Sequence, residues 1–463
     1  MKLPRIMIGA ASSGSGKTMI TCGLLQAMVN RGIKVGAFKC GPDYIDPIFH
    51  TKIIGAKSKN LDGYFTDEET TRYLFGRTAR KVDFSVIEGV MGFYDGVFVN
   101  STEASSYELS KITDTPVILV VNCKGMSLSI LPMIQGFLNY KKDSHIKGVI
   151  LNQISERLYG NIKNQIEQEL SIRVLGYVPY VKDLVIESRH LGLVLPQEVV
   201  DYHKKLNELA GILEKTLDIE EIIKLGEDTS NITYRPLPLP HVNGRPKIAV
   251  ARDDAFCFYY EDNLQILKDM GAELVEFSPL YDKHLPKKIQ GIILGGGYPE
   301  LMAKQLSENL TMREDIKAAL SQGIPCIAEC GGFMYLHRSM EDMNGQKYPM
   351  VGIIEGEVYK TNQLGRFGYI ELSSNMDQLI LERGNKIRGH EFHYFESTSQ
   401  GTSLTARKPN RPIEWECVHG NDSMAVGFPH LYYYSNPNVP YRFLQMAQIV
   451  NRETEYGGFF EKI

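Results

Sequence analysis

Short apolar runs alternate with longer amphipathic stretches through the first part of the chain. Each run is short enough to be a buried strand of a parallel sheet, and the amphipathic stretches between them favour helices. The runs lie at residues 5–10, 34–39, 84–89, 116–122, 147–153 and 174–180. Strands and helices that alternate in this way predict an α/β, doubly wound fold.

The alternation fades at residues 215–246, where an acidic stretch leads into the proline-rich segment YRPLPLPHVNGRP. Proline disfavours helices and central strands, so we place a linker at residues 226–246. Strand-like runs then resume at residues 247–253, 272–278, 291–297 and 324–330. We therefore expect two doubly wound domains, residues 1–225 with a mostly parallel sheet and residues 247–463.

Charge and composition narrow the classes of partner. The 463 residues carry a formal net charge of -4, which leaves no electrostatic footprint for nucleic acid or for an anionic membrane surface. No apolar run approaches the roughly 18 to 20 residues that cross a bilayer, and no signal peptide precedes the first strand. The seven cysteines are scattered without a CxxC pair. These features predict a soluble, cytoplasmic protein with small-molecule partners, no nucleic acid and no membrane.

A phosphate-binding loop is indicated between the first strand and the following helix. The segment reads Ala11-Ser12-Ser13-Gly14-Ser15-Gly16-Lys17-Thr18, with alanine in place of the first glycine of the strict pattern. Backbone N–H groups and the helix N-terminus would face phosphate oxygens, Lys17 would reach the β- and γ-phosphates, and Thr18 would offer its hydroxyl to Mg²⁺. The residues that we expect to bind ATP are Ser13, Gly14, Ser15, Gly16, Lys17 and Thr18.

Two acidic segments follow later strands of the same predicted sheet. One is CGPDYIDPIFH at residues 40–50, and the other is IEGVMGFYDG at residues 87–96. A parallel sheet collects its ligands at the carboxyl ends of its strands, and a magnesium nucleotide needs hard oxygen ligands. We therefore predict Mg²⁺ with ATP, and Thr18, Asp43 and Glu88 as the metal ligands. Asn152, at the end of another strand, is a candidate for setting base preference.

A candidate nucleophile lies at Cys330, between the strand-like run IPCIAE and a helical stretch. A strand-to-helix elbow of this kind exposes nucleophiles in other α/β enzymes, and the helix N-terminus favours thiolate over thiol. The glycine-rich turn at residues 295–297 also follows a strand, so its N–H groups could stabilise an oxyanion. We expect the oxyanion donors to be Gly296, Gly297 and Gly331.

A thiol nucleophile needs a base, and histidine titrates near neutrality. We choose His430, in the segment HLYYYSNP at residues 430–437. The rivals His390 and His393 lie in RGHEFHY, which lacks the HExxH spacing of a zinc site and which we interpret as structural or substrate-adjacent.

These motifs resemble the cobyrinate a,c-diamide synthase family over nearly the whole chain. The resemblance is carried by the two acidic segments and by NLDGYF at residues 60–65, LGGGYPEL at 294–301, ECGGFMYL at 329–336, RGHEFHY and HLYYYSNP. It implies a dethiobiotin-synthetase-like P-loop domain that binds ATP and a tetrapyrrole, followed by a class I glutamine amidotransferase-like domain.

The resemblance also implies roles for individual residues. Cys330 matches the glutaminase nucleophile and His430 its activating histidine. The residues that fall in segments serving ATP, metal, substrate or an acyl phosphate intermediate are Asp43, Tyr44, Ile45, Asp46, Glu88 and Asp95. One departure is visible, because ordinary class I amidotransferases carry a glutamate two residues after the histidine, where this chain has Tyr432.

The implied reaction is amidation of carboxylates with ATP and L-glutamine, and the implied macrocycle is cobyrinate or a related tetrapyrrole. Nickel-sirohydrochlorin and hydrogenobyrinate are alternative substrates for the same chemistry. A P-loop regulatory or DNA-partitioning ATPase is an alternative of another class, which would have no use for a glutaminase elbow. The order of the two amidations stays open, and a homodimer is compatible with the sequence.

Overall fold

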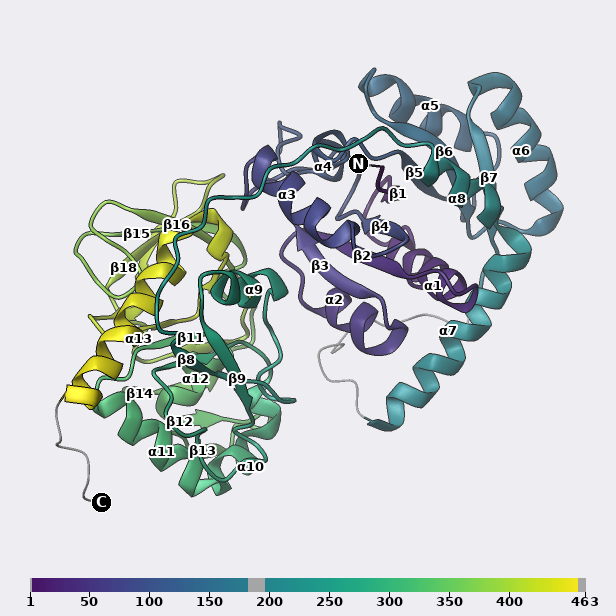
Figure 1. Cartoon of the computed structure of the whole chain (residues 1–463). Helices are drawn as coiled ribbons and strands as arrows, with labels where there is room; N and C mark the ends of the chain where they lie inside the picture. Colours follow the sequence, from purple (N-terminus) through teal and green to yellow (C-terminus); the bar gives the residue numbers. More distant parts are fainter. Residues whose placement is uncertain (1, 182–195, 457–463) are drawn as a thin grey trace. The chain divides into compact units, whose positions relative to one another are not determined.

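The computed structural model describes residues 2–181 and 196–456, and its chain divides into two compact units, Met1–Leu237 and Pro238–Ile463 (Figure 1). The division lies inside the proline-rich segment. No helix among the described residues is long and apolar enough to cross a membrane.

The first unit is built on a seven-stranded, all-parallel sheet with the order β3-β2-β4-β1-β5-β6-β7. Its strands are β1 (Arg5–Ala10), β2 (Val35–Cys40), β3 (Lys57–Leu61), β4 (Phe84–Glu88), β5 (Val117–Asn122), β6 (Ile146–Asn152) and β7 (Arg173–Val178). Because β2, β4 and β1 are neighbours and parallel, the segments that follow them meet at one edge of the sheet.

Helices accompany this sheet, and some of them share one hydrophobic core with its strands. They are α1 (Lys17–Asn30), α2 (Ile45–Phe49), the π-helix η1 (His50–Ile54), α3 (Glu68–Ala79), α4 (Ser106–Ile112), α5 (Ile130–Tyr140), α6 (Glu156–Leu170), α7 (Pro196–Thr216) and α8 (Ile219–Glu227). Helix α7 packs along α1 (Figure 1). Gly23 permits this approach, because a Cβ there would lie 2.6 Å from Cδ1 of Leu213.

The second unit contains a six-stranded sheet with the order β20-β21-β11-β10-β8-β9, parallel except where β20 meets β21. Its strands are β8 (Lys247–Ala251), β9 (Glu273–Phe277), β10 (Gly291–Leu294), β11 (Cys326–Glu329), β20 (His419–Gly420) and β21 (Met424–Gly427). Its helices are α9 (Glu261–Asp269), η2 (Pro299–Met302), α10 (Ala303–Glu308), α11 (Leu310–Ser321), α12 (Gly331–Leu336), η3 (Tyr433–Ser435) and α13 (Asn438–Tyr456).

Two smaller, largely antiparallel sheets complete this unit, with the orders β13-β12-β14-β17 and β19-β18-β15-β16-β22. Their strands are β12 (His337–Glu341), β13 (Lys347–Pro349), β14 (Ile354–Lys360), β15 (Gly368–Ser374), β16 (Lys386–Glu391), β17 (Phe395–Ser397), β18 (Leu404–Arg407), β19 (Glu414–Cys417) and β22 (His430–Leu431). The second sheet positions His430, which lies opposite His390 in the pairing of β22 with β16.

The predicted α/β fold with a parallel sheet is confirmed, and each predicted strand is present within two or three residues of its expected bounds. The sequence missed β3 because its residues, KSKNL, form no apolar run. Its buried polar side chains are satisfied by tertiary hydrogen bonds, such as the one from Asn60 Nδ2 to the carbonyl of Gly41 (2.9 Å).

Candidate functional site

The loop between β1 and α1 has the backbone that phosphate binding requires. Gly14 and Gly16 have φ angles of 75° and 93°, in the left-handed region that favours glycine. A Cβ on Gly16 would lie 2.3 Å from Nδ2 of Asn152, which donates to the carbonyl of Ser15 (2.8 Å). Asn152 therefore packs against the loop and stabilises it through this hydrogen bond. Its part in base preference stays a prediction. Ser13 and Gly14 are exposed at the loop's tip.

Lys17 is the first residue of α1 and lies across the loop. Its ammonium donates to the carbonyl of Ser12 (3.2 Å) and to that of Met91, on the loop after β4. Burial, and then the neighbouring Lys39, lower the pKa of Lys17 to about 8. In a desolvated site beside a second cation, the charged form of a lysine is stabilised when negative phosphate oxygens bind next to it.

Glu88 is the centre of a buried charge cluster at the carboxyl ends of β4 and β2. Its Oε1 accepts hydrogen bonds from Thr18 Oγ1 (2.6 Å) and Lys39 Nζ (2.7 Å). Lys39 also contacts Asp46 Oδ2 at 2.5 Å, and His50 Nε2 lies 3.6 Å from Glu88 Oε2. Glu88 is completely buried, and this burial raises its pKa although Lys39 opposes the shift. The cluster links the phosphate loop to the first acidic segment.

Asp43 and Asp46 hold the start of α2. Oδ1 of Asp43 accepts from the N–H groups of Ile45 (2.7 Å) and Asp46 (3.3 Å), while the predicted site residue Tyr44 is buried beside them. Burial, and then the charge of Asp46, raise the pKa of Asp43 to about 6. Burial alone would also raise the pKa of Asp46, but the charges and hydrogen bonds of its neighbours, Lys39 foremost, together outweigh burial and the pKa is lowered.

Asp95 shapes the loop after β4. Its Oδ2 accepts from the N–H of Gly92 (2.8 Å), and a Cβ on that glycine would meet the same oxygen at 2.4 Å. Met91, next to Gly92, has a φ of 46° and turns its carbonyl to Lys17. The structure thus brings the loop of Asp95 to the phosphate loop.

Thr18 and Glu88 fit a magnesium nucleotide. They place a hydroxyl and a carboxylate oxygen 2.6 Å apart beside the phosphate loop, and Mg²⁺ usually takes one or two protein ligands with phosphate and water completing its shell. No group of three or more His, Cys, Asp or Glu side chains suited to a metal occurs among the described residues. Asp43 fits less well, because its Oδ1 already accepts from the N–H groups of Ile45 and Asp46 at the start of α2.

In the second unit, Cys330 occupies a strained elbow between β11 and α12. Its φ of 47° and ψ of −105° are unusual for a residue with a side chain. The Cys330 N–H donates to the carbonyl of Gly427 (2.8 Å), and its carbonyl accepts from Met334 (2.9 Å). A Cβ on Gly332 would lie 2.2 Å from the carbonyl oxygen of Leu294, so glycine is required where the elbow crosses β10.

The three predicted oxyanion glycines lie around this elbow. A Cβ on Gly331 would be 3.1 Å from the backbone nitrogen of Gly297, and one on Gly296 would be 2.5 Å from Cε1 of His430. Gly297 has a φ of 154° and passes against the carbonyl of Ala255. The structure thus brings the glycine turn, the elbow and His430 together.

His430 is buried in β22 and neutral. Burial, and then His390 and His393, lower its pKa well below the usual range. The His390 ring stacks on it with centroids 4.9 Å apart and planes at 18°. His393 instead stacks on Phe428 (4.1 Å) and hydrogen-bonds the carbonyl of Phe395 through Nδ1 (2.7 Å). Of the three histidines, His430 is the one that abuts the glycine turn.

The thiol of Cys330 is neutral in this form, which corrects the expectation that the helix N-terminus would favour thiolate. Burial, and then the carboxyl of Glu300, raise its pKa far above the usual range, with Glu391 and Glu329 adding to the shift. The N–H of Gly331 lowers it only in part. Helix α12 has six residues, too few for a strong dipole, so activation must come from a base.

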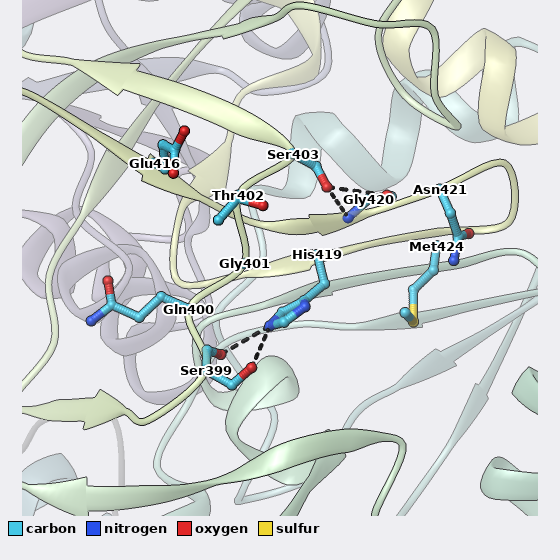
Figure 2. A pocket seen from close by; sticks show the side chains of 10 residues that line it. All are labelled: Ser399, Gln400, Gly401, Thr402, Ser403, Glu416, His419, Gly420, Asn421 and Met424. Atoms are coloured by element: carbon cyan, nitrogen blue, oxygen red, sulfur yellow. Dashed lines mark hydrogen bonds between the residues drawn. The ribbon is translucent and has the colours of Figure 1, made fainter.

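A cavity of about 600 Å³ lies elsewhere in the second unit (Figure 2). It is lined by Ser399, Gln400, Gly401, Thr402, Ser403, Glu416, His419, Gly420, Asn421 and Met424. In Figure 2 the ring of His419 turns toward Ser399, whose carbonyl it meets at 2.9 Å. None of the predicted site residues belongs to this lining, so the cavity does not mark the site.

Sequence reasoning missed several polar residues that the fold places at these sites. Lys39 is the last residue of the predicted strand KVGAFK, and His50 is the last residue of the motif CGPDYIDPIFH. These positions were the available signals for the two residues. Glu329 directly precedes Cys330 and is buried with Oε2 3.8 Å from His430 Nδ1. No pattern in the sequence indicates that contact.

Comparisons with known proteins match both units. The CobQ/CobB/MinD/ParA nucleotide binding domain matches residues 6–194, and the CobB/CobQ-like glutamine amidotransferase domain matches residues 247–426. The cobyrinate a,c-diamide synthase of Caldanaerobacter subterraneus is 40% identical to the chain, over 96% of this chain and 99% of the relative. The chain belongs to the cobyrinate a,c-diamide synthase family. The resemblance found in the sequence is thereby confirmed.

Other members of the cobyrinate a,c-diamide synthase family match as completely. Those of Listeria innocua and Dehalococcoides mccartyi are 39% and 38% identical, over 94% and 97% of this chain and 97% and 99% of the relatives. Among solved structures, PurLQS from Thermotoga maritima has 15% identity over 45% of this chain and all of that one, with a TM-score of 0.32 that is too low to carry an argument. Membership of the family makes this chain a glutamine-dependent amidating ligase with a nucleotide-binding domain.

Proposed function

We propose that the chain converts the a- and c-side-chain carboxylates of cobyrinate into amides, with ATP and L-glutamine as co-substrates. The observation that carries this proposal is the near full-length similarity to enzymes named for that reaction. It is supported by a phosphate loop in one unit and a cysteine elbow in the other. The same chemistry on nickel-sirohydrochlorin or hydrogenobyrinate is the alternative.

The first unit would activate the carboxylate. A carboxylate is a poor electrophile, so one of its oxygens attacks the γ-phosphorus of ATP, ADP leaves, and an acyl phosphate forms. The loop N–H groups and Lys17 would hold the β- and γ-phosphates. Thr18 and Glu88 would hold Mg²⁺, which supplies charge neutralisation on the phosphates. Ammonia then attacks the acyl carbon and loses a proton as phosphate departs, leaving the amide.

The second unit would supply ammonia. Sγ of Cys330 attacks the side-chain carbonyl carbon of glutamine, and the thiol proton passes to His430. The N–H groups of Gly296, Gly297 and Gly331 would stabilise the negative oxygen of the tetrahedral intermediate. His430 returns the proton to the departing ammonia, and a thioester remains. Water then hydrolyses the thioester to glutamate and restores the thiol.

The macrocycle is tested by product mass. Purified protein is incubated with ATP, Mg²⁺ and glutamine, with cobyrinate, hydrogenobyrinate or nickel-sirohydrochlorin in parallel tubes. Two amidations of cobyrinate, with little reaction of the others, are the expected result. Amidation of the nickel compound alone would make nickel-sirohydrochlorin the substrate, and no amidation in any tube would refute the proposed reaction.

The division of labour is tested at the nucleophile. Cys330→Ala should abolish glutamine-dependent amidation but keep amidation with added ammonium, because only the source of ammonia is lost. Cys326→Ala is a matched control, since Cys326 is a buried cysteine on β11, the strand that leads to Cys330, and carries no proposed chemistry. If a folded Cys330→Ala protein is not rescued by ammonium, the assignment of the two reactions to the two units is wrong.

A further inference from the structure

The residue that orients His430 is not where ordinary class I amidotransferases place it. Tyr432 stands two positions after His430 and provides no carboxylate. Its side chain is 1% exposed and packs edge-on against Tyr260, with ring centroids 5.1 Å apart, while its N–H donates to the carbonyl of Arg388 (3.0 Å). Tyr432 therefore belongs to an aromatic core.

A buried carboxyl reaches His430 from another strand instead. Glu329 is the last residue of β11, and both of its oxygens face β22. Oε1 accepts from the N–H of Leu431 (3.3 Å), and Oε2 lies 3.8 Å from Nδ1 of His430. The backbone hydrogen bond anchors the carboxyl, so its second oxygen is held beside the imidazole.

Two further contacts restrict the imidazole ring. Gly296 lies against its Cε1 edge, where a Cβ would be 2.5 Å away. His390 covers one face, and His390 is itself tied by Nδ1 to the hydroxyl of Tyr260 (3.1 Å). Burial lowers the pKa of His390 to about 3, so this neighbour stays neutral. It therefore does not compete with His430 for the charge of Glu329. Packing against Gly296 and His390 thus fixes the position of the His430 ring, while Glu329 faces its Nδ1.

We propose that Glu329, the residue immediately before the nucleophile, is the positioning residue for His430 and takes the part that a glutamate after the histidine plays in ordinary class I amidotransferases. The inference rests on the proposed glutaminase function of Cys330 and His430. An ionised Glu329 carboxylate beside Nδ1 favours the tautomer that carries its proton there, and Nε2 is then unprotonated and can accept the thiol proton.

The same arrangement stabilises the charged state of the reaction. When Glu329 is ionised, transfer of the thiol proton to His430 places an imidazolium beside a carboxylate in a buried environment, where opposite charges interact strongly. Burial raises the pKa of Glu329 to about 8 and lowers that of His430, so each group is costly to ionise alone. The pair ionises more easily together, during turnover.

The test uses Glu329→Gln in the full chain. Glutamine is isosteric and can still accept from the Leu431 N–H, so the backbone anchor is kept. We expect kcat for glutamine hydrolysis to fall about 100-fold with KM changed less than about threefold, which is the range for losing a group that supports proton transfer. Ammonium-dependent amidation should be unchanged. Glu416→Gln removes an exposed carboxyl from the cavity of Figure 2 and should behave as wild type.

A spectroscopic measurement separates orientation from general stability. ¹⁵N shifts of labelled histidine should assign the proton of His430 to Nδ1 in the wild type and show a mixture of tautomers in Glu329→Gln, with His430→Gln identifying the signal. Wild-type kcat and tautomer in Glu329→Gln would overturn the inference and leave the glutaminase proposal standing. Loss of the ammonium-dependent reaction as well would also overturn it, since the role would be structural. Glutamine hydrolysis by Cys330→Ala would refute the proposed function itself.

Discussion

Single residues at the edge of the first sheet keep their charge in a desolvated place, and Lys17 shows the consequence for nucleotide binding. Its pKa is lowered to about 8 by burial and then by Lys39. Below that pKa the side chain carries the charge that phosphate needs, and above it the charge is lost. ATP binding at higher pH therefore requires uptake of a proton.

We expect the Kd for MgATP to be about tenfold higher at pH 9 than at pH 7, because about one lysine in ten remains protonated one unit above its pKa. Isothermal titration calorimetry in buffers of different ionisation enthalpy would measure both Kd and proton uptake. Lys17→Arg keeps its charge and should show nearly the same Kd at both pH values. A wild-type Kd independent of pH would contradict the explanation.

Lys39 is a second buried residue in this region, and its substitution should lower the free energy of unfolding. It compensates two buried carboxylates, Asp46 and Glu88, at 2.5 and 2.7 Å. Lys39→Met leaves both without their cation, and removal of one partner from a buried ion pair costs about 3 to 5 kcal/mol. Urea unfolding should show that loss.

The matched control for this variant is an exposed ion pair. Lys386 contacts Glu371 at 2.6 Å with 59% of its side chain exposed, so Lys386→Met should change the free energy of unfolding by less than about 1 kcal/mol. Equal effects of the two substitutions would mean that the cluster around Glu88 is not a buried charge network.

At the scale of elements, the position of Cys330, the proposed nucleophile, depends on three backbone segments that pass close together. Strand β11 ends at the elbow, α12 starts there, and β10 carries the glycine turn beside it. Gly332 is the closest point, at 2.2 Å from a Cβ position to the carbonyl of Leu294. A backbone carbonyl in a sheet cannot move aside as a flexible side chain can.

Gly332→Ala should therefore lower the free energy of unfolding by about 1 to 3 kcal/mol, as overpacking does, and displace Cys330. Glutamine hydrolysis should fall by at least an order of magnitude while ammonium-dependent amidation continues. Gly136→Ala, in α5 with open space around it, should stabilise the protein by about 0.5 to 1 kcal/mol. Full glutaminase activity in Gly332→Ala would show that the elbow tolerates a shift.

At the scale of the whole molecule, each unit has its own sheet and hydrophobic core. Two separate cores favour two unfolding transitions over one. We expect scanning calorimetry to resolve two, and saturating MgATP to raise only that of residues 2–237. At a concentration 100 times Kd, the nucleotide should add about 2.7 kcal/mol to that transition. Lys17→Ala should remove the shift, and an equal shift of both transitions would contradict independent units.

Some features of this protein follow from local sequence. Apolar runs of strand length determine the parallel sheets, because a strand buried on both faces cannot carry exposed polar side chains. The phosphate loop and the elbow at Cys330 also follow from local sequence, since their backbone geometry requires glycines at particular spacings. The polar strand β3 and the antiparallel sheets of residues 337–431 were missed, because their short strands are stabilised by pairing with distant segments.

The chemical state of the site was decided only by the tertiary structure. From the sequence, Cys330 was expected to favour thiolate, but burial among carboxyl groups makes it a neutral thiol. Lys39 contacts Glu88, and Glu329 lies beside His430, across 49 and about 100 positions of the chain. Local pattern determines which element a residue joins, whereas its pKa and partners depend on desolvation and on contacts that exist only once distant elements have packed.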